Sequence, residues 1–241
     1  MKINTQDLLK AGVHFGHIAR KWNPNMRPFI FMKKGGIHII DLHKTVIKLN
    51  QACDALKNIV VSGKKILLVG TKDQAKEKVF LYAKKVSMPC VTERWLGGLL
   101  TNFSTIRKSI KKMNNIDKMK KNGTFNTLLK KERLLIDRVY TKLYKNLGSI
   151  SNMNHIPGGI FLVDPNKEKI AFTEAKKLKI PIFAMVDTNT NPNEIEYPIP
   201  SNDDSSKSID IILKYVTEAI QKGYSLKNEK NDVDNKEKKV N

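Results

Sequence analysis

The chain has 241 residues, of which 44 are Lys or Arg and 23 are Asp or Glu, so its formal net charge is +21 at pH 7. This length forms one sizeable core without requiring a second globular domain. So large a positive charge indicates a polyanionic partner, either a nucleic acid or an acidic membrane surface. The membrane alternative is weaker, because no run approaches the ~18 apolar residues of a spanning helix and no N-terminal stretch resembles a signal peptide.

The N-terminal quarter of the chain predicts short elements around a basic loop. Residues 5–12 predict a helix with Thr5 as its cap and Gly12 at its end. A loop rich in His, Arg and Trp follows. Two short strands then flank the hairpin signal at residues 33–36, Lys-Lys-Gly-Gly. Residues 43–61 have the apolar period of a helix.

From residue 65 onward, apolar runs typical of strands buried on both faces alternate with amphipathic helices. This order predicts a three-layer α/β core around a parallel sheet of about five strands, with right-handed crossovers. The expected strands are 65–70, 89–93, 159–164 and 181–187, and the expected helices are 71–87, 168–179 and 205–222.

Residues 102–147 interrupt this alternation and predict a protruding antiparallel helical hairpin. Ile106, Ile110, Met113 and Ile116 form one apolar seam, and the second half repeats in a coiled-coil manner at Leu129, Ile136 and Leu143, with Val139 between them. The segment holds 13 cations against three acids. The predicted division is a core of 1–101 and 148–225, the hairpin insertion 102–147, and a disordered charged tail 226–241.

The junction between core and hairpin, residues 92–112, is the most informative stretch. A strand end leads to a turn at Gly97-Gly98, and Asn102, Ser104 and Thr105 are candidate caps for a helix start. Because the helix that follows is studded with cations, we expect this junction to present a basic arm to an anion.

Catalytic and metal-binding sites are the weaker interpretations. Gly70, Asp164 and Asp187 stand at strand ends but lack the glycine spacing of a phosphate loop or dinucleotide site. His14, His17, His38 and His43 have no neighbouring cysteine to complete a typical zinc set. Asp203 and Asp204, which with Asp187 resemble a cation or acid–base cluster, precede a helix and are expected to act as dipole caps. We therefore predict no enzyme activity, no cofactor and no metal.

Cys53 and Cys90 are predicted to be buried free thiols, which indicates a reducing compartment and a cytoplasmic location. Basic residues interleaved with aromatic and amide side chains suit contacts to phosphates and unpaired bases. Trp22 and Trp95 are equally compatible with core packing. The candidate RNA-binding residues are His17, Arg20, Lys21, Trp22, Asn23, Arg27, Lys33, Lys34, Arg94, Trp95, Asn102, Arg107, Lys108, Lys111 and Lys112.

Specific motifs occur in a fixed order across residues 8–193: LLKAGVHFGH, WNPNMRPFIF, HIIDLHKT, ILLVGTK, ERWLGGLLTNFSTIR, NGTF, IPGGIFLVDPN and IPIFAMVDTNTNP. In these motifs the chain closely resembles ribosomal small-subunit protein two, the bacterial S-two family. The resemblance implies a Rossmann-like or flavodoxin-like core with a protruding helical hairpin. The matching residues are His17, Arg20, Trp22, Asn23 and Arg27 in the N-terminal motif, and Arg94, Trp95, Asn102 and Arg107 in the central one.

The resemblance also implies a function. It predicts a non-catalytic structural constituent of the small ribosomal subunit that binds small-subunit rRNA between head and body and contacts other ribosomal proteins. It further implies help in docking the mRNA-binding protein S-one, where the organism has it. The alternative from a different class is a nucleotide-binding α/β enzyme with its site at Gly70, Asp164 and Asp187.

Overall fold

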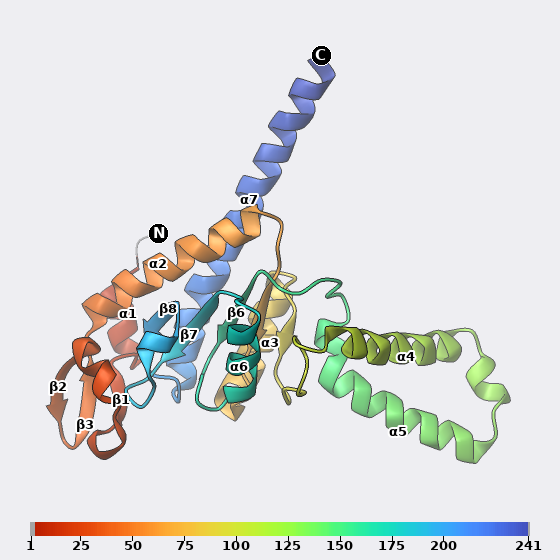
Figure 1. Ribbon diagram of the computed structural model, residues 1–241, viewed down its shortest axis with the longest axis horizontal. Helices are drawn as coiled ribbons and strands as arrows, with labels where there is room; N and C mark the ends of the chain where they lie inside the picture. The colour runs from red at the N-terminus through yellow and green to blue at the C-terminus, as the bar shows by residue number, and fades with distance from the viewer. Residues whose placement is uncertain (1–2, 241) are drawn as a thin grey trace.

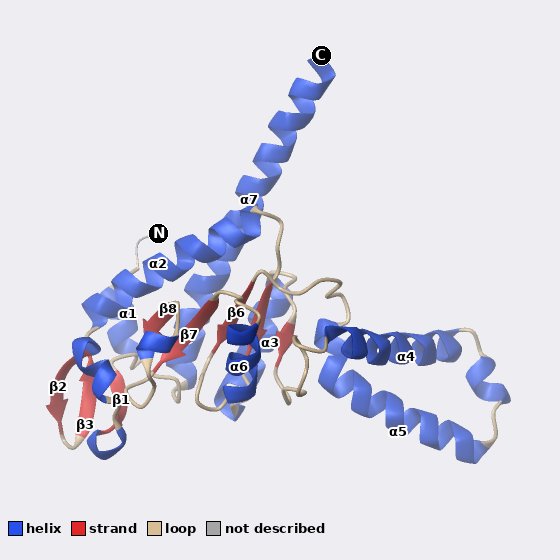
Figure 2. Ribbon diagram, in the orientation of Figure 1, coloured by secondary structure: helices blue, strands red, loops and turns tan. Residues whose placement is uncertain are grey.

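A computed structural model describes residues 3–240, apart from the side chains of Asn126 and of residues 230–240. Its centre is a five-stranded parallel sheet with the strand order β5-β4-β6-β7-β8 (Figures 1 and 2). The predicted α/β fold class is therefore confirmed. The strands are β4 (Ile66–Val69), β5 (Cys90–Val91), β6 (Gly159–Leu162), β7 (Ile182–Val186) and β8 (Tyr197–Pro200).

Helices cover both faces of this sheet, and each face has its own apolar core because successive strand residues point to opposite sides. On one face lie α2 (Leu42–Val61), α3 (Asp73–Lys85) and α7 (Ser206–Val240). On the other face lie α6 (Lys169–Lys177) and the segment around Trp95. The three predicted layers are thus present.

The strand order creates a switch point between β4 and β6. From β4 the chain moves to β5 on one side and then crosses back to β6 on the other. This is the flavodoxin-like order, in which ligands bind outside the carboxyl ends of the strands at the switch point. The loops that follow β4, β6, β7 and β8 therefore hold the residues to examine for a buried site.

The alternation of elements agrees with the prediction except at β8. The segment 197–200 has the sequence YPIP, and its two prolines do not resemble a strand signal. Proline is tolerated at a sheet edge, where a missing N–H leaves no ladder bond broken. β8 occupies that edge and pairs in parallel with β7.

A small antiparallel sheet and a short helix, α1 (Thr5–Lys10), form the N-terminal end of the molecule. The sheet has the order β1-β3-β2. The predicted hairpin is confirmed as β2 (Ile30–Lys34) and β3 (Ile37–Ile40). The loop predicted before it is wrong in one part, because β1 (Phe15–Ile18) pairs with β3. Asn4, rather than Thr5, caps α1 through the backbone N–H of Gln6.

The segment 102–147 forms two helices, α4 (Phe103–Lys121) and α5 (Lys130–Leu147), which extend away from the sheet (Figure 1). A short 3-10 turn, Thr124–Thr127, lies between them. The predicted seam of α4 is confirmed, since its members are all buried: Ile106, Ile110, Met113 and Ile116.

The seam predicted for α5 is only partly right. Leu129 precedes the helix and is 72% exposed, and Val139 is 40% exposed. Ile136 and Leu143 are among the more enclosed side chains of α5, as predicted, and Arg133, Tyr140 and Leu147 join them in place of Leu129 and Val139.

α7 is longer than expected. Its apolar stripe, which includes Ile209, Ile212 and Val216, is buried against the core as predicted. The helix then continues to Val240 beyond the core (Figure 1). This helix includes residues 226–240 of the segment 226–241 that the sequence predicts to be a disordered tail, Asn241 lies outside the described residues, and the disorder stays a prediction. Within residues 3–240, no helix combines the length and the apolar content that a membrane span needs.

Candidate nucleic-acid interface

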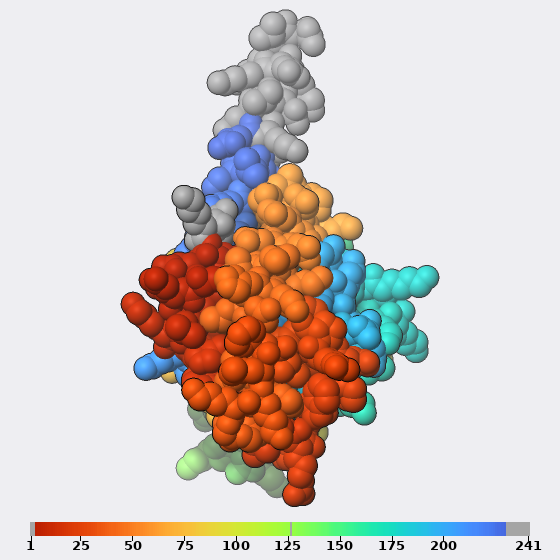
Figure 3. Space-filling model, turned by 90° about the vertical axis from the view of Figure 1, so that its left-hand side faces the viewer, coloured from red at the N-terminus to blue at the C-terminus, as the bar shows by residue number. Residues whose placement is uncertain are grey.

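Five cations of the N-terminal end are exposed to solvent. They lie on two 3-10 turns and on β2, and none is ion-paired with a residue that the structure describes. Figure 3 views the molecule from this end, where the N-terminal segment covers most of the surface. We call these residues the N-terminal basic cluster: Arg20, Lys21, Arg27, Lys33 and Lys34.

Trp22 and Asn23 organise the loop that carries this cluster. The Trp22 ring is half-buried and packs at a tilt on the ring of His38, with centroids 5.1 Å apart. The Asn23 side chain accepts a hydrogen bond from the backbone N–H of Asn25 at 3.0 Å, which starts the second 3-10 turn. The Asn23 backbone N–H donates to the carbonyl of Thr188 at 2.7 Å. Both residues therefore help to fix the loop on the core.

His17 lies among carboxylates instead of on the basic surface. Its Nδ1 is 2.8 Å from Asp187 Oδ2, and its Nε2 is 3.3 Å from Asp204 Oδ2. The hydrogen bond to Asp187 raises the pKa of His17, against the effect of burial, and the charges of the neighbouring carboxylates add to it. Both ring nitrogens thus face carboxylates of the protein itself, and the RNA contact predicted for this ring stays a prediction.

A second set of exposed cations lies on the first half of α4. Lys108, Lys111 and Lys112 are exposed, and none is ion-paired within the described part of the chain. We call these three the arm lysines. Arg107 differs, because its Nη1 donates to the Met153 carbonyl at 3.2 Å and to Asn154 Oδ1 at 2.6 Å. Arg107 therefore fastens the base of α4 to the segment after α5.

Asn102 stands at the start of α4 as predicted, but its side chain does not cap a backbone N–H. Its Oδ1 instead accepts a hydrogen bond from Thr105 Oγ1 at 2.9 Å. The predicted turn before it is present: Gly98 has a φ of +82°, which favours glycine, and its carbonyl accepts from the Asn102 N–H at 2.8 Å. The chain thus leaves the sheet where the sequence indicated.

Glu174 of α6 holds this junction, and nothing in the sequence had marked it. Its Oε1 accepts hydrogen bonds from Trp95 Nε1 at 3.1 Å and from the Gly98 N–H at 2.7 Å. Its Oε2 accepts from the N–H groups of Leu100 at 2.9 Å and Thr101 at 3.1 Å, and from the Thr101 hydroxyl at 3.2 Å. One buried carboxylate therefore ties together the whole turn that leads to α4.

These contacts favour the ionised form of Glu174 and show how Trp95 is used in the fold. Burial opposes ionisation of the carboxyl group, but the hydrogen bonds from the junction outweigh burial and hold the pKa of Glu174 below its ordinary value. Trp95 is 6% exposed and packs in the second core, so it is a core anchor in this structure and not an exposed stacking ring. Arg94 beside it is exposed.

The two basic regions lie at opposite ends of the molecule. Figure 1 shows the small N-terminal sheet at one end of the long axis and the α4–α5 arm at the other, with the parallel sheet between them. The structure therefore does not merge the predicted residues into one patch. It separates them into two surfaces on either side of the core.

Ion pairs occupy the carboxyl edge of the sheet, where the alternative hypothesis placed a nucleotide. Lys72, which follows β4, reaches across the switch point to Asp164 Oδ2 at 2.8 Å. The same ammonium lies 2.9 Å from Asp203 Oδ1 and 2.9 Å from Asp204 Oδ1. Burial would favour the neutral amine, but the charge of Asp203 and the hydrogen bonds that the ammonium donates to these carboxylates raise the pKa of Lys72.

This arrangement revises the roles expected for Asp203 and Asp204. Both precede α7, as the sequence indicated, yet their carboxylates bond to Lys72. The N–H groups of Asp204 and Ser205 are instead capped by Asn202 Oδ1 at 2.9 and 3.1 Å. The prediction of simple dipole caps therefore missed a network that closes the crevice between strand ends.

Comparison with known proteins adds a family to this geometry. The family described as Ribosomal protein S2 matches residues 8–223. The chain belongs to the ribosomal protein S2 family. It is 60% identical over 224 residues to the small ribosomal subunit protein uS2 of Flavobacterium johnsoniae, covering 93% of this chain and 88% of the relative.

Other relatives agree with this assignment. The chain is 62% identical over 217 residues to the uS2 protein of Karelsulcia muelleri, covering 90% of this chain and 98% of the relative. It is 56% identical over 239 residues to that of Christiangramia forsetii, covering 99% of this chain and 80% of the relative.

Membership of the S2 family decides between the two function classes. The family is non-enzymatic, so this chain is a ribosomal protein of the small subunit and not an enzyme. It is a structural constituent of that particle, acts in translation and has its place in the cytoplasmic ribosome.

The two cysteines, Cys53 and Cys90, are buried free thiols, as predicted. Burial raises the pKa of the Cys53 thiol to about 12.

Proposed function

We propose that the chain binds small-subunit rRNA through both basic regions at once, and that it bridges head and body of the particle. The N-terminal basic cluster is one contact surface, and the arm lysines with Arg94 form the other. Cations paired inside the protein, such as Lys72, contribute to the fold, whereas the exposed ones are available to phosphates.

The observation that carries this proposal is the pairing pattern of the charges. Lys72 is buried among three carboxylates, while the N-terminal basic cluster and the arm lysines have no ion-pair partner among the described residues. Like charges gathered on one arm repel one another unless an anion lies near them. A polyanion that contacts both ends of the molecule relieves this repulsion at both places.

The arm lysines provide the direct test. Replacing Lys108, Lys111 and Lys112 with Gln is expected to weaken binding to small-subunit rRNA and to lower the slope of log K against log salt by about two to three, roughly one per lost phosphate contact. Arg107 is left intact because its side chain fastens the arm. Filter binding at several salt concentrations measures both quantities.

A matched control removes the same charge from the core surface. Lys84, Lys85 and Lys177 are also exposed, and none is ion-paired within the described residues, so their replacement with Gln changes net charge equally. The proposal expects the core variant to keep nearly the full slope. Equal losses of slope in the two variants would mean that only net charge matters, and this would contradict a role for the arm.

The bridging part of the proposal has its own test. Cross-linking of assembled small subunits is expected to join the N-terminal basic cluster and the arm lysines to rRNA segments of different domains, one in the head and one in the body. Cross-links from both ends to a single domain would refute the bridge.

We also propose that the chain helps to hold the mRNA-binding protein S-one on the small subunit. Particles that lack this chain are then expected to retain less S-one after sedimentation than complete particles do.

A further inference from the structure

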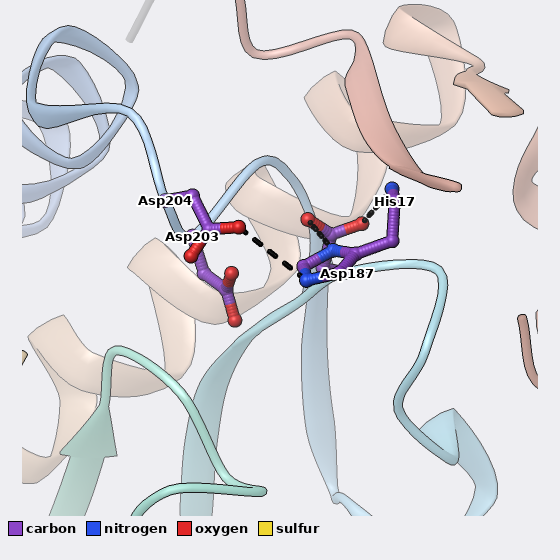
Figure 4. A group of neighbouring side chains, drawn as sticks. All are labelled: His17, Asp187, Asp203 and Asp204. Carbon is purple, nitrogen blue, oxygen red and sulfur yellow. Dashed lines mark hydrogen bonds and ion pairs between the residues drawn. The ribbon is translucent and has the colours of Figure 1, made fainter. Parts of the chain in front are cut away.

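A compact group of potential metal ligands lies beside the Lys72 network, outside both basic regions. One ligand atom from each of His17, Asp187, Asp203 and Asp204 lies within 4.8 Å of the other three. Figure 4 shows these side chains converging from separate parts of the chain. His17 comes from β1, Asp187 follows β7, and the two remaining carboxylates precede α7.

The hydrogen bonds give these four residues different roles. Asp187 Oδ2 contacts His17 Nδ1, and Asp187 Oδ1 accepts from the backbone N–H of His17 at 3.2 Å. Both Asp187 oxygens are thus used to orient the histidine. A carboxylate that holds one ring nitrogen while the other faces a metal is the usual arrangement around a histidine ligand. Nε2 is the nitrogen left for an ion, and it faces Asp204 Oδ2.

Lys72 orients the carboxylates of Asp203 and Asp204, as Asp187 orients His17. It contacts Oδ1 of Asp203 and Oδ1 of Asp204, so the Oδ2 atom of each residue is not the one that bonds to Lys72. Asp204 Oδ2 lies 3.3 Å from His17 Nε2. Asp203 Oδ2 is buried without any hydrogen-bond partner, in a residue that is 0% exposed. A buried carboxylate oxygen without a partner is costly, and a cation is the partner that such an oxygen favours.

The balance of charge within the cluster also favours a bound cation. Asp164, Asp187, Asp203 and Asp204 bring four carboxylates together, whereas the cations that contact them are Lys72 and, when protonated, His17. The cluster is therefore short of positive charge although the whole chain has an excess of it.

We propose that His17 Nε2, Asp203 Oδ2 and Asp204 Oδ2 bind one divalent transition-metal ion, with Asp187 and Lys72 as positioning residues. One imidazole nitrogen with two carboxylate oxygens suits Zn²⁺ or Mn²⁺ better than Mg²⁺, which prefers oxygen ligands in an octahedron. Such an ion joins β1 of the small sheet to the carboxyl ends of β7 and β8, and so fastens the N-terminal end to the core.

The test uses the full chain, freed of metal by a chelator and titrated with Zn²⁺ in a calorimeter. One ion per chain is expected, with Mg²⁺ binding more weakly. Asp203→Asn and Asp204→Asn keep the side-chain shape and are expected to weaken Zn²⁺ binding by at least about tenfold, and Asp187→Asn by about 10- to 100-fold. Asp54→Asn, which removes an exposed carboxylate on α2, is the matched control and keeps full affinity.

X-ray absorption of the zinc complex then locates the ion. One nitrogen with oxygen ligands at about 2.0–2.2 Å is expected, and sulfur ligands at about 2.3 Å would place the ion on a cysteine and refute the site. The proposal is also overturned if the wild-type chain binds no Zn²⁺, or if folded Asp204→Asn binds it as tightly as the wild type. Because Asp204 is more than half exposed on its side chain, this variant remains informative even if Asp203→Asn fails to fold.

Discussion

The carboxyl edge of the sheet and the first half of α4 differ in how their positive charges are balanced. At the sheet edge, Lys72 is nearly buried and contacts three carboxylates, so its charge is balanced inside the protein. On the arm, the arm lysines are exposed, and the described residues offer them no ion-pair partner. The difference teaches that net charge alone does not locate a binding surface. What distinguishes the two regions is whether the protein itself supplies the counter-charge.

The largest change in stability is expected when Lys72 is removed from the network at the carboxyl edge of the sheet. Lys72→Met leaves Asp164, Asp203 and Asp204 without their ammonium partner, and we expect it to lower the free energy of unfolding by about 3–5 kcal/mol. Urea denaturation of chelator-treated protein measures the change. Lys76→Met, which breaks only an exposed pair with Asp73, is the control and is expected to show no clear change. A stable Lys72→Met protein would mean that the network contributes little to the fold.

A smaller effect is expected at Glu174, which holds the turn at the base of the arm. In Glu174→Gln an amide NH₂ replaces one of the oxygens that accept from Trp95, Gly98, Leu100 and Thr101. Leaving buried N–H donors unpaired is expected to lower stability by about 2 kcal/mol at pH 7. Thermal or urea unfolding of the two proteins measures the difference.

The same substitution predicts a pH dependence. The pKa of Glu174 is lowered from 4.5 in the folded chain, so the ionised carboxylate stabilises the fold above that value. The stabilisation is lost as the pH falls through the folded-state pKa. The gap between wild type and Glu174→Gln should therefore be full at neutral pH and shrink below pH 4.5. A gap that stays constant at low pH would show that the charge of Glu174 is not what holds the junction.

The smallest effect is expected within the arm, where an ion pair is exposed. Lys120 pairs with Asp137 across the two helices, and its ammonium lies 4.2 Å from the centre of the Tyr140 ring. Because solvent screens such a pair, Lys120→Met is expected to change the free energy of unfolding by less than about 1 kcal/mol. A loss as large as that of Lys72→Met would remove the contrast between the two regions.

The fold was largely predictable because local patterns carry it. Apolar runs such as 65–70 and 159–164 indicated buried strands, and the cation-rich helices indicated an arm. The elements missed have weak local patterns. β1 contains Gly16 and His17, and becomes a strand only through pairing with β3. β8 has two prolines and depends on β7 in the same way.

The buried networks were less predictable than the fold. Glu174 sits within the helix sequence AFTEAKK and resembles a solvent-facing acid, yet its partners lie 73 to 79 residues earlier in the chain. His17 meets Asp187 across 170 residues. Such contacts follow from the packing of distant elements, so no window of sequence contains them. Among the candidate RNA-binding residues, Trp95 is buried and His17 contacts Asp187 and Asp204, whereas the N-terminal basic cluster and the arm lysines are exposed.

The hydrogen bonds between Glu174 and the turn at Gly98 have a consequence for assembly. The protein itself fixes this turn, because the N–H groups of Gly98, Leu100 and Thr101 all donate to Glu174. The loss of conformational freedom at the base of the arm therefore occurs during folding, and under the proposed function it is not repeated when the arm binds rRNA. In this respect the arm is preorganised, and more of the interaction energy remains for affinity.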